Sequence, residues 1–232
     1  MFNKMLVVLN DVVALFYPRI CGGCDAQLMK HEQNLCLNCI HQLPKTYYWD
    51  YETNEVEKLF WGRLDVSSAC SFVHFGKDSI VQRLMHRFKY EGRSGIGTEL
   101  GKTFGVILKE KQWFSDVDYI VPVPLHVTKE LRRGYNQSYY IAKGLAEVFD
   151  VPVKPAGLER ITASESQTRK SRFERSENVE SVFQVTDPKV VRGKNILLVD
   201  DVITTGATIE AAGRELLQNG ASRLYIAAIA SA

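Results

Sequence analysis

Residues 200–208 place two carboxylates and three hydroxyl groups within nine positions of the chain. They follow an apolar stretch, residues 196–199, of the kind that forms a strand buried on both faces. The carboxylates are Asp200 and Asp201, and two apolar residues separate them from a loop that leads into a helical pattern. The loop residues are Thr204, Thr205, Gly206, Ala207 and Thr208. Backbone amides and the helix dipole favour an anion at such a loop, and the carboxylates suit sugar hydroxyls if a divalent cation offsets their charge.

An Asp-rich turn before a Thr-capped helix would use the same residue types, but the unbroken string is rarer than its parts. Along its whole length the string resembles the signature with which type I phosphoribosyltransferases bind phosphoribosyl pyrophosphate (PRPP). The resemblance implies that Asp200 and Asp201 hold the ribose hydroxyls together with Mg²⁺. It also implies that residues 204–208 hold the 5′-phosphate.

A second strand-end loop carries arginines. Residues 121–126 read Val-Pro-Val-Pro-Leu-His, and residues 131–137 read Leu-Arg-Arg-Gly-Tyr-Asn-Gln. An arginine fork suits pyrophosphate oxygens, although a solvated arginine pair on a short helix is the alternative. Both strings are similar to the hallmark of the ComF (competence protein F) family, at the place where phosphoribosyltransferases have their pyrophosphate loop. Residues 88–92, Phe-Lys-Tyr-Glu-Gly, agree with the same family. The resemblance implies a group of pyrophosphate contacts with these members: Lys89, Arg132, Arg133, Asn136 and Gln137.

Residues 155–180 are polar and show no regular period, so they are predicted to form a long loop. Residues 167–183 resemble the Gln…Arg…Asn…Phe stretch of the ComF family, except that Thr168 stands where an apolar residue is usual. The resemblance implies that the loop corresponds to the lid of phosphoribosyltransferases and closes over a polyphosphate. Contact with a nucleic-acid backbone and simple exposure to solvent are the alternatives for its charges. The lid residues are Arg160, Gln167, Arg169, Arg172 and Arg175.

Four of the five cysteines form two Cys-x-x-Cys pairs that eleven residues separate. Each pair can aim two thiolates at one ion, so the spacing predicts a closed, structural Zn²⁺ site. Redox dithiols or core cysteines are the alternatives, and Gly22 and Gly23 are expected to relieve the first turn. His31 and His41 are expected at the surface, and Cys70 in the core. The metal ligands are predicted to be Cys21, Cys24, Cys36 and Cys39.

Composition is that of an ordinary soluble globular protein, with 45% hydrophobic and 24% charged residues and a formal net charge of +2. This near balance of basic and acidic residues does not indicate nucleic-acid binding by the chain as a whole. Residues 1–17 are apolar but lack a cleavage pattern and are too short for a membrane span, so an amphipathic helix in a cytoplasmic protein is expected.

Strand-like and helix-like patterns alternate after residue 70, which predicts an α/β fold: a type I phosphoribosyltransferase-like parallel sheet flanked by helices. The domain prediction is a zinc ribbon-like module with its leading helix (1–45), a connector (46–70) and a phosphoribosyltransferase-like domain (71–232). Strands are expected at 70–75, 119–123, 182–185, 195–199 and 224–229. Helices are expected at 78–90 with Asp78 as N-cap, at 97–111, at 138–149, and at 208–219 with Gly220 as the stop.

The favoured function is an enzyme that binds PRPP with Mg²⁺ and transfers the phosphoribosyl group, with pyrophosphate as the leaving group. The ComF resemblance links the chain to natural transformation. It therefore keeps open a non-catalytic factor that binds single-stranded DNA or nucleotides and works with the DNA-uptake machinery. A PRPP sensor without turnover is a third hypothesis. No histidine lies in a motif that assigns a general base, and the acceptor is not identified.

Overall fold

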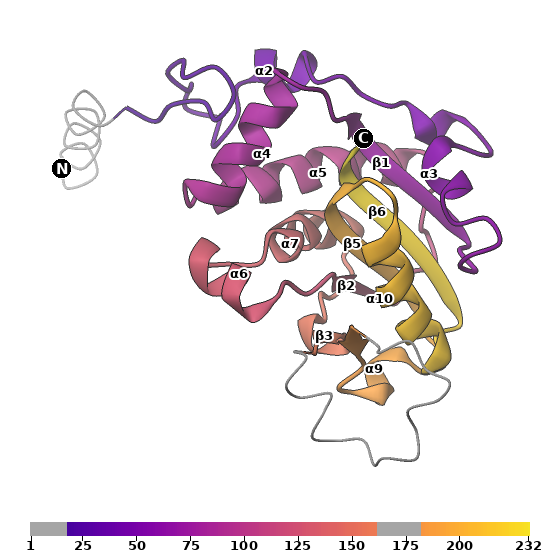
Figure 1. Ribbon diagram of the computed structural model, residues 1–232. Coiled ribbons are helices and arrows are strands. Elements are labelled where there is room, and N and C mark those ends of the chain that lie inside the picture. Colours follow the sequence, from indigo (N-terminus) through magenta and orange to yellow (C-terminus); the bar gives the residue numbers. More distant parts are fainter. Residues whose placement is uncertain (1–17, 162–181) are drawn as a thin grey trace, which may run out of the picture.

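Four parallel strands form the central sheet, in the order β1-β6-β5-β2 (Figure 1). The computed structural model describes residues 18–161 and 182–232. The strands are β1 (Ser68–His74), β2 (Tyr119–Pro122), β5 (Asn195–Ile203) and β6 (Arg223–Ser231). The central strands β5 and β6 are almost continuously apolar and buried, as a parallel sheet covered on both faces requires. The predicted parallel α/β sheet is confirmed.

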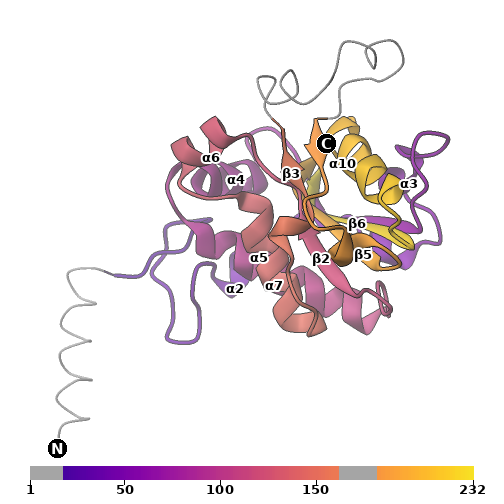
Figure 2. The ribbon, with the colours of Figure 1, turned by 90° about the horizontal axis from the view of Figure 1, so that it is seen from below.

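Helices cover both faces of the sheet (Figure 2). One face packs against α4 (Ile80–Tyr90), α5 (Ser94–Glu110) and α7 (Gln137–Phe149), and the other against α3 (Glu55–Lys58), α9 (Pro188–Val191) and α10 (Ala207–Gln218). The remaining elements are short. They are α2 (Leu37–His41), η1 (Tyr48–Asp50), α6 (Val127–Arg133), η2 (Pro155–Gly157), β3 (Glu159–Arg160) and β4 (Phe183–Gln184).

Helices α5 and α7 approach each other backbone to backbone because glycines line their contact. A Cβ atom at Gly144 would lie 2.2 Å from the carbonyl oxygen of Thr98, and one at Gly101 would lie 2.4 Å from that of Ile141. No side chain can occupy such positions without moving a helix. This close contact holds α7, which carries part of the candidate site, firmly against the sheet.

Several predicted boundaries are wrong by a few residues. Ser79, not Asp78, caps α4 through its side chain, and Asp78 has a positive φ of 55°. The helix predicted from residue 97 begins at Ser94. The strand predicted to end at Val199 continues to Ile203, because residues 200, 202 and 203 pair with β6. Gly220, with a φ of 90°, follows α10 as expected.

Residues 46–70 do more than connect two parts. They fold into η1 and α3, they bury Phe60, and Asn54 Nδ2 donates to the Ala69 carbonyl oxygen at 2.8 Å. Leu35 and Trp49 share one core cluster with α5 and the sheet. The segment therefore packs on the first strand, and the predicted division at residues 45 and 70 stays a proposal.

Two further expectations concern the long loop after residue 155 and the segment 1–17. Residues 155–160 contain η2 and β3 and are not irregular as predicted, while the rest of the long loop and the leading segment 1–17 lie outside the described residues. Among the described residues, no helix has the length and apolar character needed to span a bilayer.

Candidate functional site

The two predicted carboxylates lie side by side at the end of β5. Asp200 Oδ1 accepts hydrogen bonds from Ser138 Oγ at 2.9 Å and from the backbone amide of Asp201 at 2.8 Å. Asp201 Oδ2 forms an ion pair with Lys89 Nζ at 2.7 Å, and the Asp201 side chain is 14% exposed. Burial, followed by the charge of Asp201, raises the pKa of Asp200 to about 7. Two largely buried carboxylates side by side, with Lys89 as the one side-chain cation that contacts them in the described residues, form a destabilised pair that a cationic or hydroxyl-rich ligand would relieve.

The loop after β5 leads directly into α10. Gly206 is the N-cap of α10 with a φ of 77°, and no side chain caps this helix. A Cβ atom at Gly206 would lie 3.0 Å from Phe60, so both the backbone conformation and the tight contact favour glycine. Thr204, Thr205 and Thr208 are exposed. Among the first-turn amides of α10, that of Ala207 donates to Thr205 Oγ1 at 3.5 Å, and binding of an anion by this loop stays a prediction.

Arg63, which sequence reasoning missed, braces this loop. Its Nη1 donates to the carbonyl oxygen of Thr205 at 3.2 Å, and its Nη2 pairs with Glu210 in the first turn of α10. Glu210 also accepts a hydrogen bond from Arg214 Nη2 at 2.8 Å. Residues 63 and 205 are 142 positions apart. No local pattern in the connector indicates such a contact.

The predicted pyrophosphate loop is a short helix followed by a tight turn. Arg133 Nη1 donates to Gln137 Oε1 at 2.7 Å, and its guanidinium group lies over the ring of Tyr90 at 5.6 Å. Gly134 ends α6 with a φ of 80°. Arg132 is exposed at the end of the same helix.

Residues 135–137 hold the loop to its neighbours. Asn136 caps α7 by accepting from the Ser138 amide at 3.0 Å, and its Nδ2 donates to the Val123 carbonyl oxygen at 3.0 Å. Gln137 is fully buried, and the hydroxyl of Tyr135 donates to the carbonyl oxygen of Phe88 on α4. In the described structure these side chains position the loop. Their role as ligand contacts stays a prediction.

The structure thus brings two other segments to the acidic pair. Lys89 reaches it from α4 and Ser138 from α7, while the pair itself lies on β5. The resemblance assigned Lys89 to pyrophosphate, and that role stays a prediction; in the structure the lysine pairs with Asp201. Ser138 was missed, although it directly follows the motif that ends at Gln137. That adjacency was the available signal.

Only one of the predicted lid residues lies in the described part of the chain. Arg160 is in the short β3–β4 ribbon, with its guanidinium group 5.4 Å from the centre of the Phe183 ring. The other members lie outside the described residues: Gln167, Arg169, Arg172 and Arg175.

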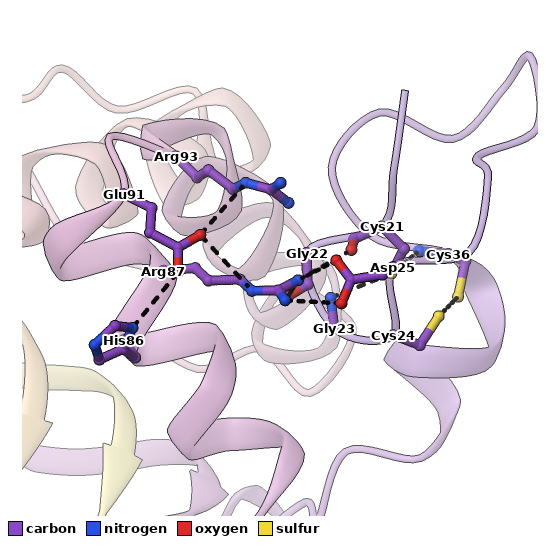
Figure 3. Close-up of polar contacts among 10 residues, drawn as sticks. All are labelled: Cys21, Gly22, Gly23, Cys24, Asp25, Cys36, His86, Arg87, Glu91 and Arg93. Carbon is purple, nitrogen blue, oxygen red and sulfur yellow. Dashed lines mark hydrogen bonds and ion pairs between the residues drawn. The ribbon is translucent and has the colours of Figure 1, made fainter. Parts of the chain in front are cut away.

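The four predicted metal ligands gather at one point, and their Sγ atoms all lie within 4.8 Å of one another. Cys24 Sγ and Cys36 Sγ are 3.7 Å apart (Figure 3). Tetrahedral Zn–S bonds of about 2.3 Å require S···S separations of about 3.8 Å, so this pair already has the required spacing. Cys21 and Cys39 are buried, whereas Cys70 lies in the core away from this cluster and His31 and His41 are exposed, as expected.

The backbone around the cluster favours thiolates. The amides of Gly23 and Cys36 both point at Cys21 Sγ, at 3.3 Å. Burial alone would raise the pKa of Cys21, but these amide hydrogen bonds outweigh it and lower the pKa to about 7. A Cβ atom at Gly23 would lie 2.7 Å from Cys39 Sγ. This glycine therefore makes room for the second pair, and it does not relieve a strained turn as predicted. The cluster fits a four-thiolate metal site.

Arg87 fixes the cysteine cluster to α4 (Figure 3). Its Nη1 and Nη2 each donate to one carboxylate oxygen of Asp25 at 2.8 Å, and Nη1 also donates to the Gly22 carbonyl oxygen at 3.0 Å. The hydrogen bonds from Arg87 hold the pKa of the Asp25 carboxyl below its usual range. Two residues further along α4, Lys89 contacts Asp201. One helix therefore joins the metal-binding group to the acidic pair.

A family model and two relatives match this chain in sequence, and one solved structure is reported beside them. The family described as Phosphoribosyl transferase domain matches residues 136–232. Competence protein ComFC of Bacillus subtilis is 33% identical, over 91% of this chain and 94% of that protein. DNA utilization protein YhgH of Salmonella typhimurium is 30% identical, over 62% of this chain and 63% of that protein. Glutamine PRPP amidotransferase from B. subtilis, solved with ADP and GMP, has 22% identity and a TM-score of 0.43, over 62% of this chain and 30% of that one.

The parallel sheet, its flanking helices and the matched domain define an α/β protein with the type I phosphoribosyltransferase fold. The similarity to ComFC covers nine tenths of both chains, and the chain belongs to the ComF (competence protein F) family.

Proposed function

We propose that this protein binds PRPP at the end of β5 and that it binds or transfers the phosphoribosyl group. The single observation that carries the proposal is the continuous unit formed by Asp200, Asp201 and the uncapped start of α10. A phosphate at the loop would gain amide hydrogen bonds and the helix dipole. Ribose hydroxyls at the acidic pair would gain the strong acceptors that two carboxylates supply.

The acidic pair also explains why a divalent cation belongs to the proposal. Carboxylate oxygens are the donors that Mg²⁺ prefers, and Lys89 is the one side-chain cation that contacts the pair in the described structure. Mg²⁺ would supply charge to stabilise a departing pyrophosphate. The residues of this chain would orient the ribose, through Asp200 and Asp201, and hold its 5′-phosphate. A screen of bases, nucleotides and DNA for pyrophosphate release would identify the acceptor of a transfer reaction.

The test is thermal stabilisation by PRPP with Mg²⁺. The wild-type protein should show a higher Tm with saturating ligand, because a ligand that binds only the folded state stabilises it by mass action. The double variant Asp200→Asn, Asp201→Asn should show no shift. Glu147→Gln, an exposed carboxylate on α7, is the matched control and should keep the full shift. An unchanged shift in the double variant would remove the sugar-binding role of the pair.

A second candidate function is a platform for single-stranded DNA, and the name of the relative YhgH, a DNA utilization protein, favours it. Binding would use the basic side chains of the predicted lid, Arg169 and Arg172 among them. Contacts to phosphates release counterions, so affinity should fall steeply with salt, and Arg169→Ala with Arg172→Ala should flatten that dependence. Equal slopes for both proteins would exclude the lid as the DNA-binding element.

We propose zinc as the metal of the cysteine cluster, held by Cys21, Cys24, Cys36 and Cys39. All four ligands come from the protein, so the ion would have a structural role and leave no position for a substrate. Metal analysis of the purified protein should find about one zinc per chain.

A further inference from the structure

A cavity away from the proposed phosphoribosyl site opens where the strands of the sheet begin. It has a volume of about 930 Å³. Its walls come from η1 and the residues after it, from the segment that follows α3, from the turn after α5, and from the first residues of β1 and β6. The proposed PRPP site lies toward the other end of the strands, since Arg223 at the start of β6 pairs with Asn195, five residues before Asp200. Phe60 lies between the two sites, since it lines the cavity and also packs against Gly206 of the phosphate loop.

All three tryptophans of the chain line this cavity, although they are far apart in the sequence. Trp49 is buried in the wall, and its carbonyl oxygen accepts a hydrogen bond from Trp113 Nε1 at 3.1 Å. Trp61, by contrast, is 62% exposed, and Tyr51 on the same cavity is 61% exposed. Large aromatic side chains left open beside a rigid aromatic wall are typical of the anchoring residues of protein interfaces.

The charges around the cavity are mostly negative. Four acidic and two basic residues line it. Each basic residue already pairs with an acid: Lys111 Nζ lies 2.7 Å from Asp50, and Arg223 Nη1 lies 2.7 Å from Asp116. In the described part of the chain, neither of the other two acids has an ion pair: Glu52 is exposed, whereas Glu57 is partly buried and accepts a hydrogen bond from the Ala69 amide at 3.1 Å. The cavity is therefore locally acidic on a chain whose formal net charge is +2.

The exposed aromatic side chains and the negative local charge together favour one kind of binding partner. Aromatic faces attract cations, and unpaired carboxylates do the same, whereas both disfavour the phosphates of a nucleic acid. We propose that the cavity, called here the tryptophan groove, is a docking site for a partner protein. The docking segment would carry arginine or lysine side chains next to apolar ones. Its cations would lie over Trp61 and Tyr51 and pair with Glu52, and its apolar side chains would contact the aromatic wall.

The position of the tryptophans provides a direct test, because every tryptophan of the protein reports on the groove. The probe is a synthetic peptide without tryptophan, acetyl-Gly-Arg-Leu-Arg-Leu-Arg-Gly-amide, titrated into the full-length protein. We expect a saturable change in tryptophan fluorescence, with the same Kd by calorimetry. Glu52→Lys should weaken binding at least tenfold. Glu147→Lys makes the same charge change on α7, outside the groove, and should leave the Kd unchanged.

Two further measurements separate the groove from general charge attraction. Trp61→Ala should weaken peptide binding about tenfold, and Trp61→Tyr should largely restore it, because a tyrosine ring also binds cations. Trp61 is exposed, so neither change should alter Tm by more than a degree or two. The proposal is overturned if no saturable binding occurs, or if the glutamate version of the peptide or oligothymidylate binds the groove as tightly. PRPP-induced stabilisation should be unaffected by Trp61→Ala, so this test stands apart from that of the proposed function.

Discussion

Replacing Asp200 by Asn should stabilise the ligand-free protein at neutral and alkaline pH. Burial, and after it the charge of Asp201, raise the pKa of Asp200 from 3.8 to about 7 in the folded protein. Between these two values the unfolded chain carries an ionised Asp200, whereas the folded chain keeps it protonated. The folded state therefore binds the additional proton, and the free energy of unfolding falls as pH rises through this window.

The size of the effect follows from the change in pKa. A rise from 3.8 to about 7 corresponds to a loss of about 4 kcal/mol above pH 7. Asn keeps the Oδ1 atom that accepts from Ser138 and from the Asp201 amide, so the variant retains both hydrogen bonds and removes the buried charge. We expect a gain in stability of about 2–4 kcal/mol at pH 8 and almost none at pH 4.

Urea denaturation at a series of pH values from 4 to 9 measures this directly, without added PRPP or magnesium. The free energy of unfolding of the wild type should fall between pH 4 and 7 relative to that of Asp200→Asn. Glu147→Gln serves as control, since it removes one exposed carboxylate and should follow the wild-type profile.

A variant that is less stable than the wild type at pH 8, or that has the same pH profile, would refute this reasoning. It would mean that Asp200 is not a destabilised acid in the folded protein. The expected result, combined with lost PRPP binding, would show that the pair is kept for function at the expense of stability.

Three further changes test the supports of the two sites. Arg63→Ala should reduce the PRPP-induced rise in Tm by half or more, because the loop of Thr205 loses its brace, and a thermal melt measures this. Gly144→Ala should lower stability by about 1–3 kcal/mol in urea, because its methyl group would meet the Thr98 carbonyl oxygen. Arg87→Ala should speed zinc release to a colorimetric chelator several-fold, because Asp25 and the Gly22 carbonyl lose their clamp.

Each of these three predictions would be contradicted by a specific result. A full Tm shift in Arg63→Ala would show that the loop keeps its shape unaided. Unchanged stability in Gly144→Ala would mean that α5 and α7 can separate without loss. For Arg87→Ala, Arg83→Ala on the exposed side of α4 is the control, and equal release rates in the two variants would show that the clamp does not hold the metal-binding group.

Local sequence patterns predict much of the fold. The apolar run before Asp200 and the helical period after Thr208 predict β5 and α10, because strand and helix periodicities depend on neighbours in the sequence. The spacing of the four cysteines likewise predicts that they cluster. The start of α4 was misjudged, since Asp78 and Ser79 are both good caps and only the tertiary position of the turn selects between them.

The chain's local patterns are thus enough to identify a set of chemical groups and the elements that bear them: the acidic pair, the phosphate loop and the thiols. Which distant side chains meet these groups depends on tertiary packing. Ser138 on Asp200, Arg63 on the loop, and Trp49, Trp61 and Trp113 around one cavity are contacts between remote segments. Such contacts depend on how helices and strands pack across the sheet, and no local period in the chain encodes that packing.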